Sequence, residues 1–273
     1  MKTKKIGERK IKYSQALNEA TSQMMENDEK VFVMGEGVDY ANGIFDSTSG
    51  LVEKFGQARV FDTPLAEDAM TGIGIGAALL GMRPIMVHAR IDFLMLTMNQ
   101  LVNHASKWPY LCGGSVPVVV RAIIGRGWGQ GAQHSQSLQA LFAHIPGLKV
   151  IMPVTPYDAK GMLISAIKDN KPVVCIEHRW LYDKMGDVPE EIYEVPIGRG
   201  KIARAGKDVT VVAVSQMVLE ALEAAIILAE GYCIEAEVVD LRTVRPIDEA
   251  IICKSVKKTG RLIVADTGWK SCG

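Results

Sequence analysis

The sequence has few aromatic residues, few cysteines and no excess of either charge. Phe, Trp and Tyr make up 6% of the 273 residues, and 31 acidic side chains balance 31 basic ones. A neutral chain without a basic stripe or an acidic tail gives no reason to expect nucleic-acid binding. With 48% hydrophobic residues and 26 glycines, the composition is typical of an α/β protein whose helices pack closely on a sheet.

The five cysteines are irregularly spaced and form no CxxC pair, which favours a reducing compartment. Residues 1–5 are basic but precede no apolar segment, so we expect no signal peptide. No uncharged apolar run reaches the roughly 18 residues that a membrane span needs. These absences together favour a soluble, cytoplasmic protein with no membrane partner.

Helical and strand periodicities alternate along the first two thirds of the chain. Apolar residues at helical spacing predict helices over residues 13–27, 67–80, 93–107, 137–142 and 156–168. Short apolar runs rich in β-branched residues predict strands over residues 31–35, 83–87, 116–124, 148–152 and 172–176. This regular alternation predicts a mostly parallel, doubly wound sheet with helices on both faces.

A second α/β pattern follows a charged segment that has no clear period. We therefore expect a first domain over residues 1–182, a linker over 183–198 and a second domain over 199–273. Strands are predicted over 208–214, 236–241 and 262–265, and helices over 217–229 and 247–256. Three strands with two helices leave a parallel sheet incompletely covered, so we expect this second doubly wound sheet to belong to a truncated domain.

Two glycine-rich segments invite a nucleotide-binding interpretation, which their context does not favour. The glycines of residues 72–76 lie inside an apolar helical pattern instead of between a strand and a helix, which favours close helix packing. The loop over residues 125–131 lacks the Lys-Ser/Thr ending of a phosphate-binding loop.

Single residues point less clearly to a site. No HExxH motif or paired spacing among the five histidines suggests zinc, and a lone histidine is most often structural. His134 is the exception, because it lies between a glycine loop and a helix start, where catalytic groups are commonly held. Glu67 opens a helix, where the helix dipole alone favours an acidic residue, so composition and spacing do not choose between a structural and a catalytic role.

Six short motifs occur in order: DTPLAE at 62–67, GMRPI at 81–85, GAQHSQS at 131–137, HIPGLKV at 144–150, DAKG at 158–161 and DLRT at 240–243. Each is weak alone. Together they closely resemble the β subunits of the E1 components of pyruvate, branched-chain and acetoin dehydrogenases, from about residue 10 onward. The resemblance implies a transketolase-like pyrimidine-binding domain followed by a transketolase C-terminal domain.

The resemblance also assigns roles by position. Glu67 matches the glutamate that hydrogen-bonds N1′ of the thiamine aminopyrimidine, and a carboxyl in an apolar pocket can hold a proton near neutrality because desolvation raises its pKa. Phe93 resembles the aromatic that packs against the pyrimidine ring. His134 matches the active-site histidine that steadies intermediates or assists transfer to the lipoyl group, and Glu36 matches an acidic position near the cofactor.

Two segments depart from the family pattern. Ala166, Asp169 and Lys171 align with a structural potassium site of some relatives, although the family often has Asn where Lys171 stands. Residues 88–92 (HARID) replace a stretch that usually carries Glu or Gln and an aromatic. The added charge beside Phe93 could alter substrate or partner preference.

The chain contains no Gly-Asp-Gly segment, with which the family holds Mg²⁺ and the cofactor diphosphate. The diphosphate half of the site must then come from a second polypeptide. The resemblance implies an α2β2 heterotetramer in which thiamine diphosphate is shared with the E1 α subunit, the α subunit holds Mg²⁺, and a lipoyl-bearing E2 acyltransferase accepts the acyl group.

The leading interpretation is decarboxylation of a 2-oxoacid, with pyruvate expected, followed by reductive acylation of a lipoyl domain through its disulfide. Acetoin cleavage by the same cofactor chemistry is the alternative within enzymes, because residues 132–136 suit both. Two other hypotheses remain: a non-catalytic α/β partner subunit and a stand-alone transketolase fragment.

Overall fold

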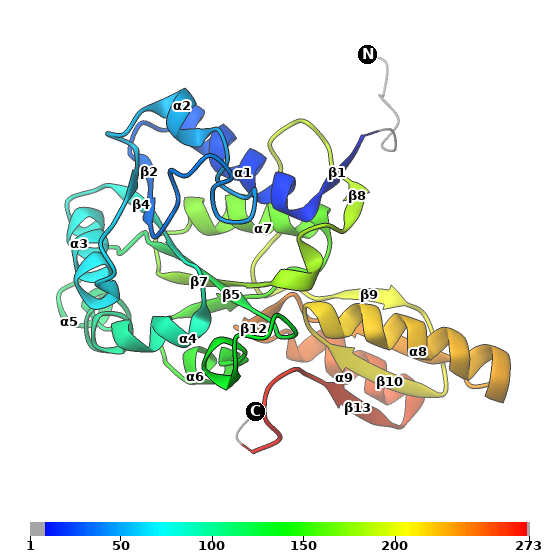
Figure 1. Ribbon diagram of the computed structural model, residues 1–273. Helices are drawn as coiled ribbons and strands as arrows, with labels where there is room; N and C mark the ends of the chain where they lie inside the picture. Colours follow the sequence, from blue (N-terminus) through cyan, green and yellow to red (C-terminus); the bar gives the residue numbers. More distant parts are fainter. Residues whose placement is uncertain (1–8, 272–273) are drawn as a thin grey trace, which may run out of the picture.

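The computed structural model describes residues 9–271, which form two α/β domains joined by a short segment (Figure 1). The basic residues 1–5, on which the signal-peptide expectation rests, lie outside the described residues. Within residues 9–271, no helix combines the length and the apolar character needed to cross a membrane.

A seven-stranded sheet organises the first domain, in the order β12-β6-β7-β5-β4-β2-β3. Its strands are β2 (Val31–Gly35), β3 (Val60–Asp62), β4 (Arg83–His88), β5 (Val119–Ile124), β6 (Lys149–Ile151), β7 (Val173–His178) and β12 (Thr243–Arg245). Neighbouring strands are parallel except β12, which runs antiparallel to β6. The predicted doubly wound sheet is confirmed, and the three-residue strands β3 and β12 are additions to the prediction.

Helices cover both faces of this sheet (Figure 1). One face carries α1 (Tyr13–Asn27), α2 (Leu51–Phe55) and α7 (Pro156–Lys168), and the other carries α3 (Glu67–Leu79), α4 (Ile91–Leu94), α5 (Trp108–Leu111) and α6 (Gln139–Ala143). Side chains of β4 alternate between the two cores, because Ile85 and Val87 join one cluster and Met86 joins the other. Burial of both faces explains why these strands read as continuous apolar runs.

The predicted helix over residues 93–107 is wrong in detail. After α4 the chain forms a 3-10 turn at Met95–Thr97 and then a π-helix at Asn99–Ala105, before the short α5. Irregular helical geometry of this kind is common beside functional sites. The predicted strand over 116–124 also begins later, at Val119, after Pro117, which has no N–H for the ladder.

The glycines of residues 72–76 lie in α3, as the packing interpretation predicts. A Cβ added to Gly74 would lie 2.3 Å from Sδ of Met86 on β4, so this position admits no side chain without displacing Met86. Gly76 has open space around it. The close-packing prediction is therefore confirmed at Gly74 and does not extend to Gly76.

The second domain contains a four-stranded sheet in the order β13-β10-β11-β9. Its elements are β9 (Lys201–Arg204), β10 (Val209–Ala213), α8 (Gln216–Tyr232), β11 (Ala236–Asp240), α9 (Glu249–Thr259) and β13 (Leu262–Ala265). The three predicted strands are parallel, and the unpredicted β9 adds to β11 in the antiparallel sense. The sheet therefore has one strand more than the sequence predicts.

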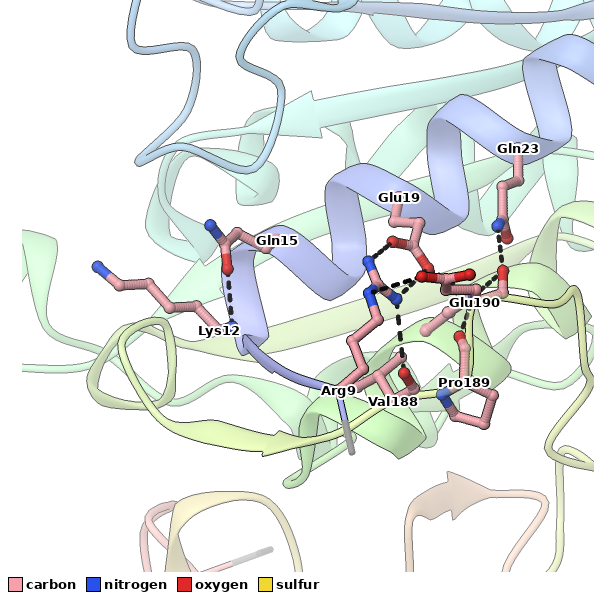
Figure 2. Close-up of polar contacts among 9 residues, drawn as sticks. Arg9, Lys12, Gln15, Glu19, Gln23, Val188, Pro189 and Glu190 are labelled. Atoms are coloured by element: carbon pink, nitrogen blue, oxygen red, sulfur yellow. Dashed lines mark hydrogen bonds and ion pairs between the residues drawn. The ribbon is translucent and has the colours of Figure 1, made fainter. Parts of the chain in front are cut away.

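The segment over residues 183–198, expected as a linker, is held firmly against the first domain. It contains β8 (Met185–Asp187), which pairs antiparallel with β1 (Lys10–Lys12). Figure 2 shows Arg9 contacting both Glu19 of α1 and the main-chain oxygen of Val188. The fully buried Lys160 donates to Glu19 at 2.6 Å and to the main-chain oxygen of Pro189 at 2.6 Å.

Two of the six motifs meet where the domains join. Asp158 is fully buried at the start of α7, and one carboxylate oxygen accepts from Arg242 at 2.6 Å. The other oxygen accepts from Lys201 of the second domain at 2.8 Å. The neighbouring Asp240 is also fully buried, and its Oδ2 lacks a hydrogen-bond partner among the described residues. Burial and the charge of Asp158 raise the pKa of Asp240 to about 6.

We expect Asp240→Asn to stabilise the protein above pH 6. The folded-state pKa lies about two units above the ordinary value, so the ionised side chain costs up to about 3 kcal/mol above pH 6, and this cost disappears below about pH 4. Asparagine keeps the oxygen that accepts from the Arg242 N–H. Urea unfolding at pH 7.5 and pH 4 measures the difference.

The matched control for this junction variant is Asp187→Asn on β8, an exposed position where a change of less than about 0.5 kcal/mol is expected at either pH. An unchanged unfolding midpoint for Asp240→Asn at pH 7.5 would contradict the electrostatic account of the junction.

Candidate active site

Three acidic residues gather at the carboxyl edge of the seven-stranded sheet. Glu36 follows β2, Asp62 ends β3, and Glu67 is the first residue of α3. In open α/β sheets this edge is where ligands bind. Asp62 is exposed and accepts from the main-chain N–H of Gly37 at 2.5 Å, which ties the two strand ends together. Glu67 is 9% exposed.

Glu36 and Glu67 form a coupled carboxyl pair. Burial, then the charge of Glu67 and a hydrogen bond with it, and then the charge of Asp62 raise the pKa of Glu36 to about 7. Oε1 of Glu36 is buried without a hydrogen-bond partner among the described residues. With a pKa of about 7, Glu36 is partly protonated near neutral pH. Glu36, which the sequence places near the cofactor, is therefore a carboxyl of this site with a raised pKa.

Phe93 and His134, which are far apart in the sequence, lie together. Phe93 belongs to α4, and His134 ends the 3-10 turn Ala132–His134. Their ring centroids are 5.2 Å apart and their planes meet at 82°, an edge-to-face contact. Nδ1 of His134 is buried and has no hydrogen-bond partner within the described part of the chain. The imidazole is therefore oriented by Phe93 and keeps a ring nitrogen available.

The charged stretch at residues 88–92 is largely buried beside this pair. Asp92 is 8% exposed, and its Oδ1 accepts from both the main-chain N–H and the side-chain amide of Gln136, at 3.2 and 2.8 Å. Asp92 therefore orients the segment that follows His134, a role that no sequence signal indicated. His88 is 1% exposed with both ring nitrogens unpartnered, and burial lowers its pKa to about 4.

The second domain reaches this region through the segment after β13. Figure 1 shows the C-terminal segment turning back toward α6. The hydroxyls of Ser137 and Thr267 lie 3.0 Å apart. A cavity of about 480 Å³ opens there, lined by Ala132, Gln133, Ser135, Gln136, Ser137, Thr267 and Trp269. Both domains thus line the space next to His134.

The residues aligned with a potassium site lie at the end of α7, away from this cluster. The main-chain oxygen of Asp169 accepts from Arg83 at 3.2 Å, and its carboxylate pairs with Lys149. Lys171 donates its main-chain N–H to Asp169, and the oxygen of Ala166 accepts from the N–H of Asp169. The side chains of Arg83 and Lys149 already contact Asp169, so potassium binding here remains a prediction.

Within residues 9–271, no group of three or more His, Cys, Asp or Glu side chains is arranged to hold a metal ion. The carboxyl pair suits a different ligand, an aromatic nitrogen base such as N1′ of an aminopyrimidine. A half-protonated pair can donate a hydrogen bond to such a nitrogen and exchange a proton with it. The unpartnered atoms of Glu36 and His134 leave hydrogen-bonding capacity for such a group.

Two family models cover the chain. The model described as transketolase, pyrimidine binding domain, matches residues 9–184, and the model described as transketolase, C-terminal domain, matches residues 198–273.

Curated relatives are similar over almost the whole chain. The β subunit of acetoin:2,6-dichlorophenolindophenol oxidoreductase from Cupriavidus necator is 48% identical, over 97% of this chain and 81% of the relative. The β subunit of 2-oxoisovalerate dehydrogenase from Bacillus subtilis is 46% identical, over 93% and 78%. The β subunit of the pyruvate dehydrogenase E1 component from Rickettsia felis is 43% identical, over 96% and 81%.

Among solved structures, a split-gene transketolase described as an inactive β4 tetramer superposes with a TM-score of 0.78. It is 24% identical and the match covers 94% of this chain and 79% of that one, which shows a shared fold.

Proposed function

The chain belongs to the family of E1 β subunits of pyruvate, branched-chain and acetoin dehydrogenase complexes, and from this premise we propose that it contributes the pyrimidine-binding half of a thiamine diphosphate site. The enzyme is a thiamine diphosphate-dependent 2-oxoacid dehydrogenase. We propose that its 2-oxoacid is pyruvate and that the acyl group passes to the disulfide of a lipoyl domain.

The Glu36–Glu67 pair carries this proposal. Thiamine diphosphate supplies a thiazolium carbon that becomes a nucleophile once its proton is removed, which protonation at N1′ assists. In our proposal Glu67 hydrogen-bonds N1′, and Glu36, whose pKa is raised to about 7, keeps a proton available at that point near neutral pH. Phe93 packs against the pyrimidine ring.

His134 is proposed to act on the reacting groups. Its Nδ1 is unpartnered within the described residues, and its ring is held by Phe93, so it can donate or accept a hydrogen bond without prior reorganisation. The neighbouring Asp92–Gln136 contacts hold the segment that follows it. This arrangement suits a group that steadies a developing charge and assists transfer to the lipoyl sulfur.

Exposed apolar side chains on α3, the helix that Glu67 opens, and in the segments before α3 and after α4 support a partner subunit. Leu65 is 82% exposed just before Glu67, Ile73 is 65% exposed on α3, and Leu96 is 60% exposed after α4. Large exposed apolar side chains that cluster at one edge mark interaction surfaces. We propose that an E1 α subunit covers them in an α2β2 heterotetramer, holding Mg²⁺ and the diphosphate, and that a lipoyl-bearing E2 visits the same site.

We expect the chain, co-purified with its cognate α subunit, to oxidise pyruvate with 2,6-dichlorophenolindophenol as electron acceptor only when thiamine diphosphate and Mg²⁺ are added. Each subunit alone should be inactive, because neither holds the whole cofactor. The measurement is dye reduction with pyruvate, 2-oxoisovalerate and acetoin as separate substrates. Turnover by the isolated chain, or the absence of thiamine-dependent turnover of all three by the assembled enzyme, would contradict the proposal.

Acetoin cleavage is the second candidate function. It is favoured by the 48% identity to the Cupriavidus necator subunit, whose name specifies acetoin. Turnover of acetoin without turnover of either 2-oxoacid would select it.

A further inference from the structure

Arg90 is a buried cation whose charge is not neutralised by contact with an acidic group. It lies at the start of α4 and is 7% exposed. Its Nη2 donates to the side-chain oxygen of Gln130 at 2.7 Å, while its buried Nη1 has no hydrogen-bond partner among the described residues. Within residues 9–271, none of the ion pairs closer than 4.0 Å involves Arg90.

A second arginine and aromatic faces surround the guanidinium. The guanidinium carbon of Arg90 lies 4.9 Å from the ring centroid of Trp128 and 6.0 Å from that of Phe45. That of Arg179 lies 4.2 Å from the same Phe45 ring. Burial, opposed in part by Asp92, lowers the pKa of Arg90, and the charge of Arg179 lowers it further.

Leaving such a group unpaired is costly, because a buried charge needs a partner of opposite sign and filled hydrogen bonds. Asp92, the acidic group that acts on Arg90, has its Oδ1 engaged by Gln136. Its Oδ2 is buried without a hydrogen-bond partner among the described residues, so it makes no contact with the guanidinium. Gln130 and Trp128 supply neutral contacts, which orient the guanidinium without compensating its charge. Among the described residues no carboxylate therefore contacts the guanidinium directly, which leaves the buried Nη1 available to an anion from outside this chain.

The location of Arg90 ties this anion to the reaction. Arg90 lies three residues before Phe93, and its acceptor Gln130 lies in the glycine loop that leads to His134. Phe93 and His134 are in contact. Arg90 is therefore linked to His134 through two segments, α4 with Phe93 and the glycine loop with Gln130.

We propose that Arg90, assisted by Arg179, is a specificity-determining residue that binds a carboxylate which the substrate carries in addition to its reacting 2-oxoacid group. The inference rests on the proposed thiamine-dependent 2-oxoacid chemistry. It keeps pyruvate as a substrate and makes a dicarboxylic 2-oxoacid the preferred one. The reacting carboxylate itself is a poor occupant. It leaves as CO₂ and loses its charge in the transition state, so an ion pair with it would stabilise the ground state and slow the reaction.

The first test compares charged substrates with neutral isosteres in the assembled α–β enzyme. Oxaloacetate is paired with 4-methyl-2-oxopentanoate, and 2-oxoglutarate with 5-methyl-2-oxohexanoate, with dye reduction as the readout. We expect kcat/KM to favour at least one dicarboxylate over its isostere by 10-fold or more. Arg90→Met should lower that ratio by roughly 100-fold, the effect of losing a charge-assisted hydrogen bond, and Arg90→Lys should retain part of it.

The second test measures binding of glutarate, an unreactive dicarboxylate, to the same complex by calorimetry, so that it does not depend on turnover. Saturable binding that Arg90→Met abolishes and Arg204→Met preserves would support the inference. Arg204 is a matched control in the second domain, paired with Glu235. Thermal unfolding of the assembled Arg90→Met variant checks that it is folded.

Three outcomes would overturn the inference while leaving the proposed function intact. The first is a preference for neutral substrates that Arg90→Met does not change. In the second, the variant weakens thiamine diphosphate binding but not glutarate binding, which would make the cofactor phosphates the anion. In the third, the variant weakens assembly with the α subunit at unchanged substrate preference, which would make the anion a partner carboxylate. If the assembled enzyme is inactive but binds glutarate in an Arg90-dependent way, the proposed function is contradicted and carboxylate binding by Arg90 is supported.

Discussion

Replacement of Glu67 by Gln is expected to reduce kcat of the assembled enzyme by roughly 10²–10⁴-fold, the range found for the loss of a general acid or base. The amide has the size of the carboxyl and can still hydrogen-bond a ring nitrogen, but it cannot exchange a proton with it. Glu67 starts α3 on the main chain and makes no side-chain cap there, so the fold should tolerate the change. Dye reduction at saturating thiamine diphosphate and pyruvate, with the thermal transition as a check on folding, measures the effect.

Asp68→Asn is the matched control, because Asp68 is also acidic and lies in the same first turn, but is exposed. It should leave kcat within twofold of the unmodified enzyme. Glu36→Gln tests the pair itself. Removing the group whose pKa is about 7 should eliminate or displace an inflection of kcat near pH 7. Full activity of Glu67→Gln would mean that this carboxyl is a structural helix-start residue and that the proton relay lies elsewhere.

The long periodic elements could be predicted from the sequence almost to the residue. The helices α1 and α7 and the strand β13 have the predicted bounds. The elements that escaped prediction are short. They are the strands β1, β3, β8, β9 and β12, each of three or four residues, and the helices α2 and α5. Such strands carry too little periodicity to be recognised. Their pairing is decided by tertiary contacts, as when β12 leaves the second domain to pair with β6.

The individual residues of the candidate site could be predicted from the sequence, but the contacts between them could not. Glu67, Phe93 and His134 follow from ordered motifs, whereas the edge-to-face contact of Phe93 with His134 depends on how the chain returns to the same sheet edge. The proton near neutrality could not be assigned from the sequence. It depends on the distance between Glu36 and Glu67, which come from different strand–helix units.

Two of the six motifs make structural contacts that the sequence did not indicate. DAKG and DLRT helped to identify the family, and in the structure they form the domain junction through the pair of Asp158 with Arg242. Gly161 of DAKG lies where an added Cβ would be 2.5 Å from Val195 and 2.7 Å from Tyr193. In this chain, two of the motifs that carry the family resemblance therefore pack the first domain against residues 183–198 and the second domain.

Arg121→Met is expected to cost about 3–5 kcal/mol of folding stability, the largest loss that we expect from a single substitution outside the active site. Arg121 of β5 and Glu177 of β7 are both fully buried, and the guanidinium donates to the two carboxylate oxygens at 2.6 and 2.9 Å. It also donates to the hydroxyl of Ser47 at 2.8 Å, and Tyr182 donates to Glu177. Without Arg121, Glu177 would be left as an uncompensated buried carboxylate.

We expect the loss of stability to come from the uncompensated charge of Glu177 and not from lost packing. A double variant separates the two causes. Arg121→Met combined with Glu177→Gln removes both charges while keeping an acceptor for the Tyr182 hydroxyl. We therefore expect the double variant to be more stable than Arg121→Met alone, a coupling that urea unfolding midpoints measure directly. Arg204→Met, which breaks the half-buried pair with Glu235, should cost less than Arg121→Met, about 1 kcal/mol. If the stability losses of Arg121→Met and Glu177→Gln, measured separately, simply added in the double variant, the first domain would be stabilised by packing around Arg121 and not by its ion pair.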